Sequence, residues 1–246
     1  MANYVYGIHA VTALLKQQPE CIDYLVLLSE RQDTALMACE ALGKKNNLKI
    51  ERSTRAEMDA LLKERVAHQG MVAVCKGWPE YSEESDLEGI LTHAEQPRLI
   101  LILDGIQDPH NLGACLRVAN AMGVCCVIAP KDKSARMSGT VAKVSCGAVF
   151  TTPFIPVTNL ARVMSMLKEA GIWLLGASAD AKRELRAVDL KGDIAVVMGA
   201  EGTGLRRLTE EKCDFLAKIS MAGSVGSLNV SVATGICLYE VHRQRI

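Results

Sequence analysis

Residues 98–130 read RLILILDGIQDPHNLGACLRVANAMGVCCVIAP and predict a strand, a helix and a second strand in succession. The apolar runs at 98–104 and 124–130 show no alternation with polar residues, which is typical of strands buried on both faces. Between them, from about Asn111 to Met122, apolar residues recur at helical spacing. Because two strands joined through a helix lie parallel in a sheet, this stretch predicts an α/β domain.

The chain beyond residue 130 continues the pattern. We expect a helix at 159–171 and strands at 172–178, 194–199 and 215–221, which together predict a parallel sheet covered on both faces. A last helix, over about 229–244, has two apolar faces, so we expect it to be covered on two sides. Its faces are formed by Val230, Ala233, Cys237 and Val241 and by Val232, Ile236 and Tyr239.

A smaller α/β module is predicted for residues 1–75. A helical face near the start of the chain is formed by Ile8, Val11, Leu14 and Leu15, and strands are expected at 22–28, 48–51 and 70–75. Thr34 could cap a helix that ends before Gly43, and Thr54 with Glu57 has the spacing of a capping box for another helix.

Residues 76–97 are acidic, carry prolines near both ends and have little apolar patterning. Such a composition predicts a linker with one or two helical turns. The sequence therefore predicts three parts, which are a small α/β domain at 1–75, an acidic linker at 76–97 and a larger α/β domain at 98–246.

Composition bounds the class of protein. The chain has 246 residues, 49% of them hydrophobic, which is enough for a sizeable core. No apolar run approaches the roughly 20 residues of a spanning helix, and the first residues lack a signal-peptide layout. We therefore expect a cytoplasmic protein without membrane contact. Nine cysteines, an odd number without a C-x-x-C pair, indicate buried thiols and no metal site.

Charge is distributed unevenly although the formal net charge is zero. Residues 76–97 hold one basic and six acidic side chains, whereas residues 98–246 hold 18 basic and 13 acidic ones. A mildly basic domain is compatible with a polyanionic partner, although many domains reach this balance without one.

The helix after the strand at 98–104 carries a candidate ligand-binding arginine. Arg117 lies on a different face from the apolar stripe, and a lone arginine in such a place is usually a solvated side chain. Small residues keep the start of this helix narrow at the carboxyl end of a strand, where open α/β sheets bind ligands. This position favours a binding role for Arg117.

Two later loops have related features. VVMGAEGTGLRRL (196–208) follows a strand with the glycine order G-x-x-G-x-G, which fails the dinucleotide-binding pattern but permits close backbone approach to a ligand beside Glu201. GSVGSLNVSVATG (223–235) precedes the last helix, where Ser227, Asn229 and Ser231 supply polar atoms and small residues leave room. Taken singly, each loop is also explained as a plain turn or helix cap.

Taken together, the three loops resemble the sequence motifs of the SpoU (TrmH-like) family of RNA ribose 2′-O-methyltransferases. The matching stretches are NLGACLRVA (111–119), MGAEGTGL (198–205) and SLNVSVATGICLYE (227–240), in this order and each beside the predicted carboxyl end of a strand. YGIHAV (6–11) and HQGMVAV (68–74) resemble the small RNA-binding module of members with an extended N-terminus. The resemblance thus covers nearly the whole chain.

The resemblance implies a SPOUT-type α/β catalytic domain with a C-terminal trefoil knot, preceded by a small RNA-binding module. It also implies a homodimer that completes each active site across its interface, S-adenosyl-L-methionine as cofactor, and a guanosine of 23S ribosomal RNA as substrate. Carried onto this chain, the cofactor site would involve Gly199, Ile219 and Leu228. The family's catalytic positions fall on Asn111, Arg117, Glu201, Ser227 and Asn229.

The role of Arg117 has two interpretations. The resemblance allows it to act as the base that deprotonates the ribose hydroxyl, but a free guanidinium has a pKa above about 12 and stays protonated in proteins. Alternatively, Arg117 binds the phosphate beside the target ribose while Glu201 orients its guanidinium. Further RNA contacts are expected from four basic residues, which are Arg136, Lys143, Arg206 and Arg207.

Three other functions are alternatives to an rRNA methyltransferase. A transfer RNA methyltransferase of the same family remains an alternative, since extended members with that substrate could also carry the N-terminal module. A non-catalytic RNA-binding protein of the same fold is less favoured because Arg117, Glu201 and Asn229 are all present. A nicotinamide-dependent oxidoreductase is disfavoured by the missing glycine fingerprint after the first strand.

Overall fold

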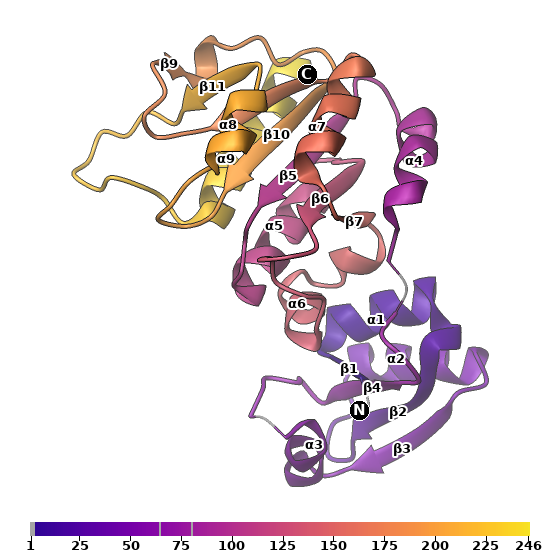
Figure 1. Ribbon diagram of the computed structural model, residues 1–246. Coiled ribbons are helices and arrows are strands. Elements are labelled where there is room, and N and C mark those ends of the chain that lie inside the picture. The colour runs from indigo at the N-terminus through magenta and orange to yellow at the C-terminus, as the bar shows by residue number, and fades with distance from the viewer. Residues whose placement is uncertain (1–2, 64, 80) are drawn as a thin grey trace. The chain divides into compact units, whose positions relative to one another are not determined.

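The structure is a computed structural model that describes residues 3–63, 65–79 and 81–246. The chain forms two compact units, each described below by itself (Figure 1). Unit 1 comprises residues 1–80 and 136–151, and unit 2 comprises residues 81–135 and 152–246. The expected division therefore differs from the observed one in two segments: the expected linker 76–97 is shared between the two units, and 136–151 belongs to unit 1.

Unit 1 is built on a four-stranded mixed sheet in the order β1-β4-β2-β3. The strands are β1 (Asn3–Tyr6), β2 (Ile22–Leu28), β3 (Lys49–Ser53) and β4 (Met71–Cys75). β4 is antiparallel to β1 and β2, whereas β2 and β3 are parallel. The helices are α1 (Ile8–Gln17), α2 (Thr34–Lys45) and α3 (Arg55–Leu62), and the short 3-10 turn η1 (Pro19–Cys21) connects α1 to β2.

Helix α2 differs from its expected form at both ends. Its N-cap is Asp33, whose carboxylate accepts a hydrogen bond from the Leu36 amide at 3.0 Å, and Thr34 is the first helical residue. The helix also continues through Gly43, where a Cβ atom would lie 2.6 Å from Leu25 Cδ1. Gly43 therefore packs closely on β2 and does not end the helix. The expected capping box of α3, formed by Thr54 and Glu57, is present.

Residues 136–151 pack within unit 1 through helix α6 (Gly139–Val144) and the turn η3 (Ala148–Phe150). A Cβ atom on Gly139 would lie 2.5 Å from the carbonyl oxygen of Tyr4, so only glycine permits this approach to β1. The hydroxyls of Tyr6 and Thr140 lie 3.0 Å apart. The segment was expected inside the larger domain, and its packing could not be read from helical or strand periodicity.

Unit 2 contains a seven-stranded sheet in the order β7-β6-β5-β10-β8-β11-β9, and all its ladders are parallel. The expected parallel α/β sheet is thus confirmed. Its strands are β5 (Leu99–Asp104), β6 (Cys126–Pro130), β7 (Phe154–Val157), β8 (Trp173–Ala177), β9 (Arg183–Glu184), β10 (Ile194–Gly199) and β11 (Phe215–Lys218).

The helices of unit 2 cover this sheet. They are α4 (Leu87–His93), α5 (Pro109–Ala121), α7 (Leu160–Glu169), α8 (Arg207–Lys212) and α9 (Val230–Arg245), with the 3-10 turns η2 (Glu84–Asp86) and η4 (Leu185–Ala187). Side chains that alternate along a strand, such as Ile100 and Leu101, are both fully buried, so both faces of the sheet are covered. Leu87 and Leu91 of α4 belong to the same core cluster as Ile100. Part of the expected linker is therefore core of unit 2.

Helices α5 and α9 pack side by side. Cys115 Sγ of α5 lies 3.5 Å from Thr234 Oγ1 of α9, and Thr234 donates its hydroxyl hydrogen to the carbonyl of Val230 at 2.7 Å. Burial raises the pKa of Cys115 to about 11 and that of Cys237 to about 12, so both thiols are neutral packing groups. This contact fixes the start of α9 beside the start of α5.

The second apolar face of α9 is exposed in the chain. Val230, Cys237 and Val241 are buried, as expected for one face. The other face, formed by Val232, Ile236 and Tyr239, is 52%, 37% and 56% exposed. One side of α9 is therefore covered within the chain, and no element of the described residues lies over the other side.

All nine cysteines are free thiols. Within residues 3–63, 65–79 and 81–246, no His, Cys, Asp and Glu side chains gather into a group suited to a metal ion. The helices in that part of the chain are too short or too polar to cross a membrane.

Candidate active site

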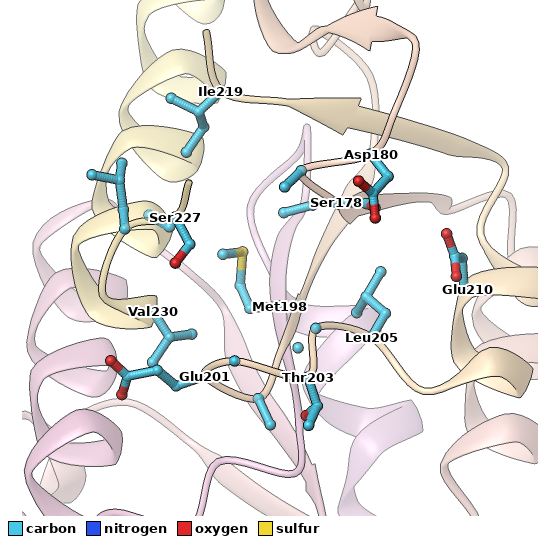
Figure 2. Close-up of a pocket in the computed structure, with 18 of the residues that line it drawn as sticks. Ser178, Asp180, Met198, Glu201, Thr203, Leu205, Glu210, Ile219, Ser227 and Val230 are labelled. Carbon is cyan, nitrogen blue, oxygen red and sulfur yellow. The ribbon is translucent and has the colours of Figure 1, made fainter. Parts of the chain in front are cut away.

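A cavity of about 320 Å³ opens at the carboxyl ends of three neighbouring strands of unit 2 (Figure 2). The loops after β8, β10 and β11 line it, together with the first turn of α9. Its volume lies near the lower end of the range usual for small-molecule sites. Ligands of open α/β sheets bind at this edge because the loops that follow parallel strands converge there.

The loop after β10 is tightly folded, and glycines make this possible. Ala200 and Gly204 exchange two backbone hydrogen bonds of 3.0 and 2.9 Å. A Cβ atom on Gly199 would lie only 2.1 Å from the carbonyl carbon of Gly204, and Gly202 and Gly204 adopt positive φ angles of 79° and 68°. The G-x-x-G-x-G order is thus explained by a narrow turn, which presents Glu201 at the cavity (Figure 2).

An ion pair between a buried carboxylate and a half-exposed arginine fixes the far end of this loop. Asp104, the last residue of β5, has a fully buried side chain and accepts hydrogen bonds from Arg206 Nε at 2.6 Å and from the Arg206 amide at 3.2 Å. Arg206 was expected to contact RNA, but its guanidinium is held by Asp104. Arg207 forms an exposed ion pair of 2.9 Å with Glu211.

Three of the predicted catalytic residues form one hydrogen-bond chain beside the cavity. Asn229, the N-cap of α9, donates from Nδ2 to Asn111 Oδ1 at 2.9 Å. Asn111, in the first turn of α5, donates from Nδ2 to Glu201 Oε2 at 3.1 Å. The packing of α5 on α9 and the turn after β10 bring Asn111 to Glu201, 90 residues later in the chain, and to Asn229, 118 residues later. Ser227, a fourth predicted residue, lines the cavity itself.

Arg117 stands apart from this group. It is exposed on α5 and does not line the cavity. In residues 3–63, 65–79 and 81–246, no hydrogen bond or ion pair to Arg117 is present, and Glu201 accepts its hydrogen bond from Asn111 instead. The suggested orientation of Arg117 by Glu201 is therefore not found within one chain.

The three predicted cofactor-binding residues, Gly199, Ile219 and Leu228, all line the cavity. Apolar walls come from Met198 and Leu205 as well (Figure 2). Three carboxylates, those of Asp180, Glu201 and Glu210, face it, and its described lining contains neither lysine nor arginine. Apolar walls with acidic side chains suit a ligand that combines an aromatic ring with positive charge, as S-adenosylmethionine does.

The sequence prediction missed one wall of the cavity. Residues 177–180, at the carboxyl end of β8 and just after it, and Glu210 of α8 complete the lining. The strand ending at 178 was predicted, and the rule that loops after parallel strands carry ligands could have pointed to it. What was missing is the strand order, because only the position of β8 beside β10 brings the two loops together.

Two family matches cover most of the chain. Residues 98–239 match the SpoU rRNA Methylase family, and residues 4–80 match the family described as RNA 2′-O ribose methyltransferase substrate binding. The first match spans the sheet of unit 2, the cavity and the hydrogen-bond chain.

Curated relatives are similar over nearly their full length. The chain is 51% identical over 241 residues to the 23S rRNA (guanosine-2′-O-)-methyltransferase RlmB of Coxiella burnetii, covering 98% of this chain and 95% of that one. It is 48% identical over 245 residues to the RlmB of Escherichia coli, covering 100% of both.

A solved structure supports the fold. The SpoU methyltransferase AviRb from Streptomyces viridochromogenes in complex with the cofactor AdoMet superposes with a TM-score of 0.80 over 98% of this chain and 90% of that one, at 22% identity. This level of identity shows a shared fold. The family match over residues 98–239 and the identity of about one half to full-length relatives together establish that the chain belongs to the SpoU rRNA methylase family.

Proposed function

We propose that this protein transfers a methyl group from S-adenosylmethionine to the ribose 2′-hydroxyl of a guanosine in 23S ribosomal RNA. The observation that carries the proposal is the hydrogen-bond chain of Asn111, Glu201 and Asn229 beside a carboxylate-lined cavity. Relatives named for this reaction share about half of their residues with the chain over its whole length, which supports the same substrate.

The cavity would hold the cofactor. S-adenosylmethionine supplies, when bound, an electrophilic methyl group on a positively charged sulfur. Ile219 and Leu228 offer apolar walls, and Gly199 allows the backbone of its loop to approach a flat ring. The carboxylates of Asp180 and Glu210 favour a cation in this space over an anion.

The polar residues beside the cavity would position the ribose. Asn111 and Glu201 present an amide and a carboxylate there, and Ser227 adds a hydroxyl. Holding the hydroxyl oxygen in line with the methyl carbon can supply roughly 7–11 kcal/mol of the barrier. In this scheme Arg117 binds the phosphate beside the target ribose, because a planar guanidinium fits oxyanions and remains protonated.

We further propose that the protein is a homodimer. The exposed stripe of Val232, Ile236 and Tyr239 on α9 suits a contact in which a second copy covers the same stripe. Arg117 does not line the cavity of its own chain. In a homodimer, Arg117 of one copy could instead complete the active site of the other copy. Ile236→Glu should convert the dimer to a monomer in light scattering, whereas Met37→Glu, at an exposed position of unit 1, should leave the dimer intact.

We propose separate roles for the two predicted domains of the chain. Residues 1–75 would bind the RNA, residues 98–246 would catalyse the reaction, and the protein would act in the cytoplasm without a metal ion.

We also propose a trefoil knot in the C-terminal part. The insertion of β10 between β5 and β8, both earlier in the chain, together with the return of α9 to α5, supports this threading.

Methyl transfer from labelled S-adenosylmethionine to unmodified 23S ribosomal RNA and to transfer RNA tests the function, with the product mapped by resistance to alkaline cleavage. We expect one methylated guanosine in 23S ribosomal RNA. Methylation of transfer RNA alone would favour the related tRNA activity, and binding without transfer would favour a non-catalytic protein.

Arg117→Ala should abolish transfer while S-adenosylmethionine binding persists. Arg186→Ala, at an exposed position of η4, should leave transfer unchanged.

A further inference from the structure

The N-cap of α9 has an unusual arrangement of donors. Asn229 Oδ1 accepts two hydrogen bonds from the same residue, one from the Ser231 amide at 2.9 Å and one from the Ser231 hydroxyl at 2.6 Å. Ser231 is the second residue of α9. None of the residues assigned to cofactor or substrate is Ser231, and it does not line the cavity.

The contact with the Ser231 backbone N–H determines the orientation of the Asn229 side-chain amide, that is, the positions of Oδ1 and Nδ2. A backbone N–H can only donate, so the atom it meets on Asn229 must be the oxygen. The Nδ2 group of Asn229 then has to face Asn111, and it donates to Asn111 Oδ1 at 2.9 Å. With its oxygen occupied in this way, Asn111 directs its own Nδ2 to Glu201 Oε2 at 3.1 Å.

The chain of hydrogen bonds therefore runs in one direction only. It starts at Ser231, whose amide and hydroxyl act as donors, and ends at Glu201, whose carboxylate acts as acceptor. Reversing the amide of Asn229 would place its Nδ2 against the backbone N–H of Ser231 and its oxygen against the oxygen of Asn111. The Ser231 hydroxyl could then accept from Nδ2, but the other two contacts would be lost, so the three side chains keep one common orientation.

We call the hydrogen-bonded series Ser231–Asn229–Asn111–Glu201 the relay. Packing of α5 against α9 already fixes the backbone that carries it. The contact of Cys115 with Thr234 holds α5 against α9, and Gly235 lies close to Val118. The two helix starts therefore keep their spacing whether or not the hydroxyl of residue 231 is present. The Ser231 hydroxyl adds a second hydrogen bond to Asn229 Oδ1, which strengthens the amide orientation that the Ser231 backbone N–H sets.

We propose that Ser231 is a positioning residue for methyl transfer, which acts through Asn229 and Asn111 to hold the Glu201 carboxylate in one orientation beside the cofactor cavity. The inference rests on the proposed methyltransferase function and extends it to a residue that touches neither cofactor nor ribose. It assigns the cap of α9 a second task, because the same asparagine that starts the helix also orients the active-site amides.

Ser231→Ala tests the proposal in the full-length protein. The variant keeps the amide donor and loses the hydroxyl donor, so we expect kcat to fall roughly three- to tenfold. The KM for S-adenosylmethionine and the melting temperature should stay unchanged. Ser231→Thr, which retains the hydroxyl, should restore kcat. Ser224→Ala, at an exposed serine of the preceding loop outside the cavity lining, serves as control and should match the wild type.

Asn229→Asp separates the cap from the relay. Aspartate caps helices as well as asparagine does and accepts the same bonds from Ser231, but it cannot donate to Asn111. We expect a folded protein with a larger loss of kcat than in Ser231→Ala, and no further loss when the two changes are combined. An equal loss from Ser231→Ala in both backgrounds would overturn the relay.

The outcomes separate the relay from the function on which it rests. A wild-type protein that methylates RNA while Ser231→Ala keeps full kcat would refute the relay alone. A wild-type protein that methylates neither RNA would refute the proposed function. If Asn229→Asp has no measurable transfer, the relay is tested by the other two variants alone. A lower kcat in Ser231→Ala that Ser231→Thr restores would support the relay, and an unchanged kcat in Ser231→Ala would refute it.

Discussion

Two carboxylates at the same edge of the unit 2 sheet have opposite surroundings. Asp104 ends β5 and pairs in the ladder with Gly199, and Glu201 follows two residues after that glycine. The Asp104 side chain is fully buried and bound to a guanidinium and a backbone amide, whereas Glu201 is exposed and has one neutral donor, from Asn111. The difference indicates that one carboxylate supports the loop and the other is available to a ligand.

The two environments have different energetic consequences. A buried charge is tolerated only when its partners replace the water it has lost, and removing one partner leaves an uncompensated charge. An exposed carboxylate keeps its hydration, so substitutions there change stability little. We therefore expect changes around Asp104 to affect folding and changes at Glu201 to affect transfer.

The largest effect is predicted for Arg206→Ala, although Arg206 is half exposed. This change leaves the buried Asp104 carboxylate without its cation and should lower the free energy of unfolding by about 3–5 kcal/mol. Urea denaturation followed by circular dichroism measures it. Arg207→Ala, which removes only an exposed ion pair, should change the value by less than about 1 kcal/mol. Equal losses in the two variants would contradict a structural role for Asp104.

The next effect concerns Glu201→Gln. We expect transfer to fall about 100-fold, the size typical when a charged active-site group is lost. The free energy of unfolding should stay within about 0.5 kcal/mol of the wild type, because the side chain is exposed. Single-turnover methyl transfer and urea denaturation give the two values, with Glu211→Gln on α8 as control. A large loss of stability together with activity would remove the contrast with Asp104.

The smallest of the three effects is predicted for Gly199→Ala, which lies between the two carboxylates. The added Cβ would meet the carbonyl carbon of Gly204 at 2.1 Å, so the turn that carries Glu201 must open. Overpacking of this kind destabilises by about 1–3 kcal/mol. Calorimetry should show weaker S-adenosylmethionine binding, whereas Gly223→Ala, with open space around it, should bind normally. Unchanged binding in Gly199→Ala would show that the turn does not shape the cavity.

Local patterns in the sequence predicted the strands of unit 2 and the loops that form most of the cavity. Gly199, Ile219 and Leu228 were named by the family resemblance, not by local patterns, and all three line the cavity. The wall formed by residues 177–180 was missed, since it depends on which strand lies beside β10. Strand order is set by packing between distant segments, and no short-range periodicity encodes it.

Other differences have the same origin. The sequence showed two apolar faces on α9 but not that only one of them packs inside the chain. Arg206 looked like a surface cation because its buried partner, Asp104, lies 102 residues earlier. Ser231 could be identified only as a polar residue near a helix start, and its two bonds to Asn229 became visible through side-chain geometry.

The packing of residues 136–151 within unit 1 affects how the protein could be divided or recombined. The chain passes from one unit to the other three times, after residues 80, 135 and 151. A truncation that removes residues 1–75 would expose the glycine surfaces of 136–151 that lie against Tyr4 and Ala13. A chimaera that exchanges the N-terminal part of unit 1 between relatives should therefore carry residues 136–151 with it, so that the two segments of unit 1 are inherited as one piece.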